Sequence, residues 1–210
     1  MTTLLDEKKQ TLESIVPEYE SKNPLIQWIF TKRLTWAVKQ CKTPDEAILD
    51  AGCWDGRVVE MLSKAWCTNI TGIDFNENVT SLTVEHARFL CEDLTKTTFE
   101  DNTFDTIIIL DVLEHFEHLE APLGELKRIL KPGGRLIVSM PTENIIYKIG
   151  RFLLKGTFSM VEWPGTGIHY HGATGLSKEI EKFFTKTSRT FHPFFPPFDL
   201  FHLSVFENSK

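Results

Sequence analysis

The chain has 210 residues, which is enough for one domain with a sizeable core, and its 11% aromatic and 25% charged residues are ordinary for a globular protein. Its net charge of −6 disfavours a nucleic-acid partner, because binding to phosphates needs basic patches. The sequence shows neither a signal peptide nor an apolar stretch of membrane-spanning length, so we expect neither secretion nor membrane contact.

The N-terminal part of the chain, residues 1–42, is predicted to be a helical extension in front of a domain over residues 43–210. Asn23-Pro24 is typical of a helix start, because asparagine caps the first turn and proline is preorganised at the first helical position. The apolar residues Leu25, Ile26, Ile29, Phe30, Leu34 and Val38 then recur at helical spacing up to about Gln40. We expect this helix to pack on the domain, and covering the mouth of a ligand site is the alternative.

Apolar segments and helical segments then alternate along the middle of the chain. One helix is predicted after the turn at Gly52–Gly56, to about Ala65. A second helix is predicted from Leu119 to Leu130, where Lys131-Pro132-Gly133-Gly134 ends it. Such alternation predicts a parallel, doubly wound sheet with right-handed crossovers. The predicted strands are Ile48–Ala51, Asn69–Asp74, Ala87–Cys91, Phe104–Leu110 and Arg135–Met140.

The pattern breaks at residues 141–172, which we predict to be an insertion or lid. Ile145–Trp163 carries apolar and basic residues typical of a helix, and a helix lying on a membrane surface is the alternative. A further helix is predicted from Thr174 or Gly175 to Phe184. The phenylalanine-rich tail after it, Thr185–Glu207, predicts two strands joined by a proline-rich connection.

Acidic residues follow the predicted strands at the ends where ligands bind in an open α/β sheet. They are Asp50, Asp74, Asp93 and Asp111, and the first is followed by a turn between Gly52 and Gly56. Carboxylates repel a polyphosphate but suit a cationic ligand that carries a ribose and an adenine. Asp74 is placed to accept hydrogen bonds from a ribose diol, with a helix cap as the alternative role. Asp93 is placed to accept a hydrogen bond from an exocyclic amine.

Five motifs over residues 48–139 resemble those of a class I S-adenosylmethionine-dependent methyltransferase of the small-molecule, methyltransferase type 11-like kind. They are ILDAGCWDG, GIDFNE, CEDL, FDTIIILDVLEH and LKRILKPGGRLIVS. The resemblance implies an α/β, Rossmann-like fold with a mostly parallel seven-stranded sheet, helices on both faces and an antiparallel last strand. It implies S-adenosyl-L-methionine as cofactor, S-adenosyl-L-homocysteine as product and a small-molecule methyl acceptor as partner. A catalytically silent cofactor-binding protein and a protein methyltransferase remain alternatives.

The resemblance also implies roles for individual residues. Trp54 stands where the family usually has glycine, so its indole either contacts the cofactor or packs as cover. The spacing of Gly52 and Gly56 lacks the middle glycine of the dinucleotide fingerprint, which disfavours a nicotinamide-dependent oxidoreductase. The residues implied to contact the cofactor are Asp50, Gly52, Cys53, Trp54, Gly56, Asp74, Phe75, Asp93, Leu94, Asp111, Val112 and His115.

Three histidines are candidates for proton transfer at the methyl acceptor: His115, His169 and His171. A base is needed only if the acceptor loses a proton, so a structural or positioning role is the alternative for each of them. No metal site is predicted, because the four cysteines are scattered without a CxxC pair. Reduced cysteines favour a cytoplasmic protein. The sequence leaves the oligomeric state open, with a homodimer as one alternative.

Overall fold

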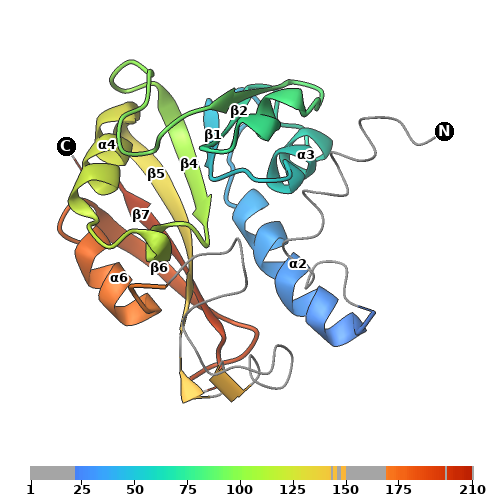
Figure 1. Cartoon of the computed structure of the whole chain (residues 1–210), viewed down its shortest axis with the longest axis vertical. Helices are drawn as coiled ribbons and strands as arrows, with labels where there is room; N and C mark the ends of the chain where they lie inside the picture. Colours follow the sequence, from blue (N-terminus) through green and yellow to red (C-terminus); the bar gives the residue numbers. More distant parts are fainter. Residues whose placement is uncertain (1–21, 143, 146–147, 150–168, 197, 210) are drawn as a thin grey trace.

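The structure is a computed structural model that describes residues 22–142, 144–145, 148–149, 169–196 and 198–209 (Figure 1). The first half of the predicted N-terminal extension, residues 1–21, and most of the predicted helix at Ile145–Trp163 therefore lie outside the described residues. None of the helices in the described ranges is long and apolar enough to cross a bilayer.

A twisted sheet of seven strands forms the centre of the described chain, in the order β3-β2-β1-β4-β5-β7-β6. Strands β1 to β5 run parallel, and β7 runs antiparallel to both of its neighbours. The predicted fold class, including the antiparallel last strand, is confirmed. The strands are β1 Ile48–Ala51, β2 Ile70–Asp74, β3 Ala87–Cys91, β4 Phe104–Leu110, β5 Leu130–Pro141, β6 Thr185–His192 and β7 Phe201–Glu207.

The strand order reverses at β1, which pairs with β2 on one side and with β4 on the other. In open α/β sheets the crevice for a ligand lies at such a reversal, beyond the carboxyl ends of the strands. The carboxyl ends of β1, β2 and β4 are followed by the segments that the sequence singled out as acidic.

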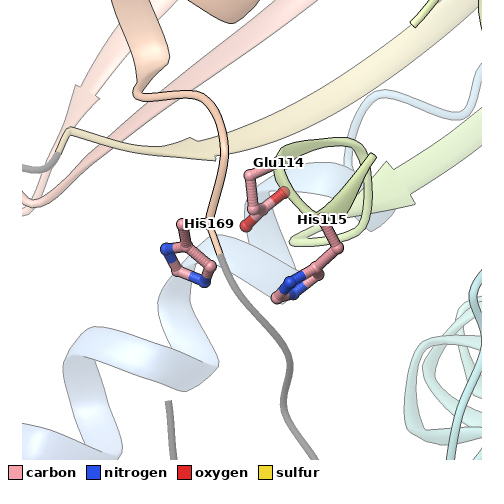
Figure 2. Close-up of side chains that lie close together, drawn as sticks. All are labelled: Glu114, His115 and His169. Atoms are coloured by element: carbon pink, nitrogen blue, oxygen red, sulfur yellow. The ribbon is translucent and has the colours of Figure 1, made fainter. Parts of the chain in front are cut away.

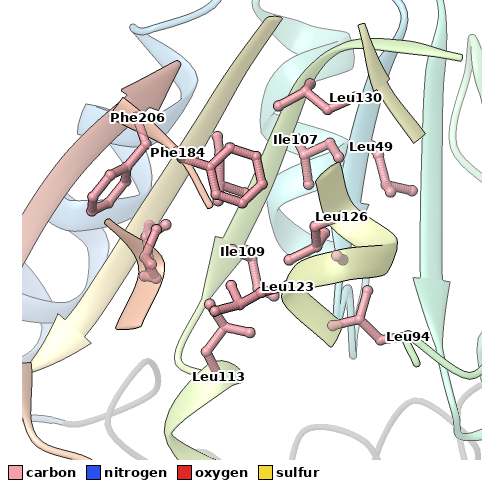
Figure 3. Close-up of a cluster of buried hydrophobic side chains, with 14 of the residues drawn as sticks. Leu49, Leu94, Ile107, Ile109, Leu113, Leu123, Leu126, Leu130, Phe184 and Phe206 are labelled. Carbon is pink, nitrogen blue, oxygen red and sulfur yellow. The ribbon is translucent and has the colours of Figure 1, made fainter. Parts of the chain in front are cut away.

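Helices cover both faces of the sheet, as Figure 1 shows. On one face, α4 (Glu120–Ile129) and α6 (Ala173–Ile180) pack on β4, β5 and β7. On the other, α2 (Pro24–Val38) and α3 (Arg57–Lys64) form a second core with β1 and β2. Figure 3 shows the first core, where Leu123 and Leu126 of α4 meet Ile107 and Ile109 of β4. Each core is built from the apolar positions that recur in its helices and strands.

The start of α2 is as predicted, because the Asn23 side chain accepts a hydrogen bond from the Leu25 N–H at 3.0 Å and Pro24 occupies the first helical position. The helix packs on α3 and β5. Its buried residues include Arg33 beside Leu34 and Ala37, so a charged side chain lies inside this contact.

The start of β5 differs from the prediction. Leu130 already pairs with Phe104 of β4, and the strand returns to register at Arg135 opposite Thr106. Gly133, with φ +74°, provides the turn between these pairs. The strand continues through this segment because Asn208 bonds its backbone: the Gly133 N–H donates to the Asn208 carbonyl at 2.8 Å, and the Asn208 N–H donates to the Gly134 carbonyl at 2.9 Å.

Candidate functional site

The turn from β1 into α3 is held against the end of β2. The N–H groups of Gly52 and Cys53 both donate to the Ile73 carbonyl, at 2.8 and 2.9 Å. Gly52 and Gly56 have φ values of +81° and +74°, the left-handed region that glycine adopts without a steric cost. A Cβ atom on Gly52 would lie 2.3 Å from Cγ2 of Val112, so the backbone here approaches the segment after β4 closely.

Asp50 is a buried carboxylate at the end of β1. The residue is 2% exposed, and its Oδ2 atom has no hydrogen-bond partner among the described residues. Burial, together with the neighbouring charges of Asp55 and Asp74, raises the Asp50 pKa to about 8. Asp50 is therefore protonated at neutral pH until a positive group comes near it.

The raised Asp50 pKa predicts a pH dependence of stability. Between the unfolded pKa of 3.8 and the folded value of about 8, the folded chain holds a proton that the unfolded chain has lost. The contribution of protonated Asp50 to the free energy of unfolding is therefore complete below pH 3.8 and is lost as the pH rises through 8. Relative to Asp50→Asn, the wild type should lose roughly 1 kcal/mol of unfolding free energy per pH unit between about pH 6 and 7.5.

Urea unfolding of both proteins across this pH range measures the difference. Asp50→Asn is the matched reference, because it keeps the shape of the side chain and cannot titrate. Parallel stability curves for the two proteins would show that Asp50 ionises normally in the fold.

Asp74, at the end of β2, is buried and holds two backbone segments. Its Oδ2 accepts from the Trp54 N–H at 3.2 Å, and its Oδ1 accepts from the Asn76 N–H at 3.0 Å. Burial raises the Asp74 pKa, while the hydrogen bonds from Asn76, Trp54 and Phe75 act to lower it. Asp74 therefore fixes the glycine turn relative to β2. The cap of the short helix Glu77–Ser81 that follows is Asn76 and not Asp74, since the Asn76 side chain accepts from the Asn78 N–H at 3.0 Å.

The end of β3 lies beside the end of β2, since the Glu92 N–H donates to the Asp74 carbonyl at 3.0 Å. Asp93 follows on the surface, where its Oδ1 accepts from the N–H and the hydroxyl of Thr95 at 2.8 and 2.7 Å. These bonds hold its pKa below the usual range. Phe75 is 82% exposed, whereas Leu94 is buried. The structure thus brings the predicted ribose and adenine residues to neighbouring strand ends.

Trp54 has φ +46°, a left-handed conformation that costs most side chains energy and glycine none. This backbone explains why a glycine suits the position. Its N–H is used by Asp74, so the turn keeps its anchor despite the large side chain.

Asp111, at the end of β4, is tied to two other elements. The Ser139 hydroxyl of β5 donates to its Oδ1 at 3.1 Å, and Nη1 of Arg33 forms an ion pair with its Oδ2. The Arg33 guanidinium lies 4.4 Å from the centre of the Phe201 ring. Helix α2 is therefore fastened over the carboxyl end of β4, which supports the alternative that this helix covers the mouth of a ligand site.

Sequence analysis missed Arg33, although its spacing carried a signal. Arg33 follows Ile29 by four positions and Phe30 by three, which places it on the apolar face of the helix. A charged residue on that face needs a buried partner, and Asp111 is that partner.

Weakening this ion pair should destabilise the fold. Asp111→Asn keeps a side chain that tolerates φ +56° but removes the charge that faces Arg33. The Arg33 side chain is 3% exposed and that of Asp111 27%, so we expect a loss of about 1.5 kcal/mol, below the range for fully buried pairs. Urea unfolding checks this value.

Glu60→Gln is the control for Asp111→Asn, because it breaks the exposed pair of Glu60 with Lys64 and should change stability by less than about 0.5 kcal/mol. Equal effects of the two substitutions would mean that the pair with Arg33 contributes no more than a surface contact.

Two of the three predicted histidines lie together. The ring centres of His115 and His169 are 4.9 Å apart, with the planes at 67°. The third, His171, lies with its Nε2 atom 3.4 Å from the Glu117 carbonyl. Figure 2 shows Glu114 beside both rings of the pair. Sequence analysis missed Glu114, a fully buried acid, and its position directly before His115 was the available signal.

Comparison with known proteins places this geometry in context. The family model "Methyltransferase domain" matches residues 49–138. A phosphoethanolamine N-methyltransferase of Triticum aestivum is 32% identical over 103 residues, which are 46% of this chain and 20% of that protein. A ubiquinone biosynthesis O-methyltransferase of Coxiella burnetii is 27% identical over 173 residues, with 66% of this chain and 74% of that protein covered. The chain thus spans a fifth of the wheat relative and about three quarters of the bacterial one.

Solved structures share the fold. The N-methyltransferase NodS of Bradyrhizobium japonicum WM9, in complex with S-adenosylhomocysteine, superposes with a TM-score of 0.65 at 19% identity, covering 98% of this chain and all of that one. Magnesium protoporphyrin IX methyltransferase of Synechocystis PCC 6803, also with S-adenosylhomocysteine, gives 0.61 at 18% identity and covers 100% of this chain and 89% of that one. At these identities the likeness concerns the fold.

Proposed function

We propose that this chain is a class I S-adenosylmethionine-dependent methyltransferase that transfers a methyl group from S-adenosylmethionine to a small-molecule acceptor, because the family model for a methyltransferase domain matches residues 49–138. The observation that carries the proposal is the buried Asp50 carboxyl at the point where the strand order reverses, with Oδ2 unpartnered among the described residues. A ligand with a positive charge at this place would ionise Asp50 and satisfy that oxygen.

The residues present fit such a cofactor. The glycine turn brings backbone, without side chains at Gly52 and Gly56, to the carboxyl end of β1. Asp55 and Asp74 place negative charge beside Asp50, with which both interact electrostatically, and Asp50 adds its own charge once a positive group ionises it. This charge favours a sulfonium and an ammonium group and opposes the phosphates of a dinucleotide.

Each residue then has a role in binding. Asp50 and the backbone of the turn hold the amino-acid part of the cofactor, and Asp74 accepts hydrogen bonds from the ribose hydroxyls. Phe75, exposed beside Asp74, and Leu94 flank the adenine, while Asp93 accepts from its exocyclic amine. When bound, the cofactor supplies an electrophilic methyl group on sulfur.

The acceptor lies where Asp111 and His115 follow β4. Methyl transfer is an in-line displacement, so positioning the acceptor and excluding water supply much of the acceleration. Helix α2, fastened through Arg33, contributes cover on this side. His115 and His169 orient the acceptor, and either accepts a proton where the acceptor loses one.

A small-molecule acceptor is supported by charge and by the relatives. The net charge of −6 disfavours nucleic acid, and the Triticum aestivum and Coxiella burnetii relatives described above carry names of small-molecule methyltransferases. The four cysteines are free of disulfides, which supports a reducing, cytoplasmic setting. We keep a monomer and a homodimer as equal alternatives for the assembly.

Calorimetry with S-adenosylmethionine and S-adenosylhomocysteine tests the proposal. We expect one site per chain for both ligands, and no binding of NADH under the same conditions. A chain that binds neither sulfur ligand at millimolar concentration would refute the proposal.

Trp54 favours a second candidate function, a protein that binds the cofactor without catalysis, because a large side chain stands at a left-handed position beside the turn. Trp54→Gly separates the two. If the indole blocks the methyl group, the variant gains methyl transfer to small nucleophiles that the wild type lacks. If the wild type is active, the substitution changes cofactor affinity alone.

A further inference from the structure

One side-chain cluster, which shares only His115 with the residues implied to contact the cofactor, combines a carboxylate with two imidazoles. Glu114, His115 and His169 each offer one donor atom, and these atoms all lie within 4.8 Å of one another. Figure 2 shows the three side chains converging from two segments, the short helix Leu113–His115 after β4 and the segment that leads into α6. Glu114 is fully buried and His169 is 6% exposed, whereas His115 is half-buried.

The two segments are held together by a backbone hydrogen bond and a side-chain contact. The Tyr170 N–H donates to the Glu114 carbonyl at 2.8 Å, directly beside His169 in the chain. The His171 ring contacts the Glu117 carbonyl, with its Nε2 atom at 3.4 Å. These contacts hold the backbone of Glu114 against that of Tyr170, which brings the donor atoms together.

We propose that Glu114, His115 and His169 form a site for a divalent transition-metal ion of the zinc class. Two imidazoles and one carboxylate are ligands that such ions prefer, whereas calcium and magnesium favour sites made of oxygen atoms. Metal–ligand bonds of about 2.0–2.2 Å bring donor atoms to roughly 3.3 Å from one another in a tetrahedral site. Donors within 4.8 Å reach that geometry by small side-chain rotations.

Three protein ligands leave an open coordination position, the arrangement of catalytic rather than structural zinc sites. His115 is partly exposed, and water or a ligand oxygen would complete the shell. Two of the three ligands, Glu114 and His115, come shortly after Asp111 and Val112 in the chain, where we place the methyl acceptor. The oxygen ligand would therefore be a hydroxyl of the acceptor. This last step rests on the proposed function, whereas the metal site itself does not.

The ion would then select an oxygen acceptor. A hydroxyl bound to a divalent cation loses its proton more readily, and that proton passes to solvent, because His115 and His169 hold the ion in this arrangement instead of acting as the base. The oxygen forms its bond to the methyl carbon as the carbon–sulfur bond of the donor breaks, and the electron pair of that bond stays on sulfur. Charge and atoms balance without a further reactant.

Metal titration of the untagged full chain tests the site without measuring activity. After chelator treatment and dialysis, ZnCl2 is titrated by calorimetry, and CoCl2 is followed by its visible absorption. The variants Glu114→Gln, His115→Ala and His169→Ala are compared with His118→Ala, which removes an exposed histidine three residues from His115. Circular dichroism shows which variants are folded, and Glu114→Gln keeps the shape of the buried side chain.

We expect one zinc ion per chain, and binding weakened by about tenfold or more in each folded ligand variant while His118→Ala stays within about twofold of wild type. Absence of zinc binding to the wild type, or binding that all three ligand variants retain, would overturn the site and leave a hydrogen-bonded glutamate–histidine cluster. S-adenosylhomocysteine is titrated into the same metal-free samples: binding there with no zinc binding refutes the metal site alone, and the reverse result refutes the proposed function alone.

Discussion

Asp74→Ala is expected to weaken S-adenosylhomocysteine binding by roughly 1–3 kcal/mol, the scale for stranding buried hydrogen-bonding groups, which is about a 5- to 150-fold rise in the dissociation constant. Asp74 would accept from the ribose, and it already holds the Trp54 N–H of the glycine turn at 3.2 Å. The substitution therefore removes a ligand contact and loosens the turn that forms the rest of the site. Calorimetry of the folded variant measures the change.

The matched control for Asp74→Ala is Asp45→Ala, which makes the same change in charge at an exposed position. Asp45 precedes the amino-terminal end of β1, whereas Asp74 lies at the carboxyl end of β2. It should leave the affinity unchanged. Asp74→Asn separates the contact with the ribose from the anchoring of the glycine turn, because it keeps one acceptor oxygen for the backbone but replaces the other with a donor. An Asp74→Ala variant that binds as tightly as the wild type would remove Asp74 from the site.

Gly52→Ala should destabilise the chain by roughly 2–4 kcal/mol, because two separate costs add. The left-handed φ of +81° is unfavourable for alanine, and the new Cβ would lie 2.3 Å from Cγ2 of Val112. The turn must shift to relieve that overlap, so cofactor affinity should fall together with stability. Urea unfolding and calorimetry measure the two effects.

A second substitution separates the two costs at Gly52. In a Val112→Ala background the overlap is removed, so Gly52→Ala should then cost only about 1–2 kcal/mol, the backbone part. Gly124→Ala is the control within α4, where an added Cβ meets nothing within 4 Å, and it should stabilise the chain by roughly 0.5–1 kcal/mol. If Gly52→Ala lowered the free energy of unfolding equally in the wild type and in the Val112→Ala background, the close approach of Gly52 to Val112 would be contradicted.

Most of the fold could be predicted because its elements follow local rules. The strands Ala87–Cys91 and Phe104–Leu110 are found at their predicted bounds, since short apolar runs between turn residues leave little choice of structure. The start of β5 was predicted at Arg135 but lies at Leu130, because Asn208 from the far end of the chain bonds the Gly133-Gly134 backbone. A contact between distant positions of this kind leaves no local pattern.

In the candidate site, too, some residues could be predicted from the sequence and others could not. Asp50 and Asp74 could be placed from the rule that parallel strands end at one edge, and the structure has them close enough to interact. Arg33 and Glu114 were missed because their importance comes from burial and partners: Arg33 lies against Asp111, and Glu114 lies close to His169, which is 55 residues further along the chain (114 to 169). The predicted roles of the individual site residues in binding and catalysis stay predictions.

The most direct test of the account is a crystal structure of this chain soaked with S-adenosylhomocysteine. We predict that the ligand lies beyond the carboxyl ends of β1 and β2, with its ribose hydroxyls on Asp74 and its ammonium group near Asp50. A ligand bound elsewhere, or a cleft that stays filled by the protein's own side chains at saturating ligand, would contradict the assignment.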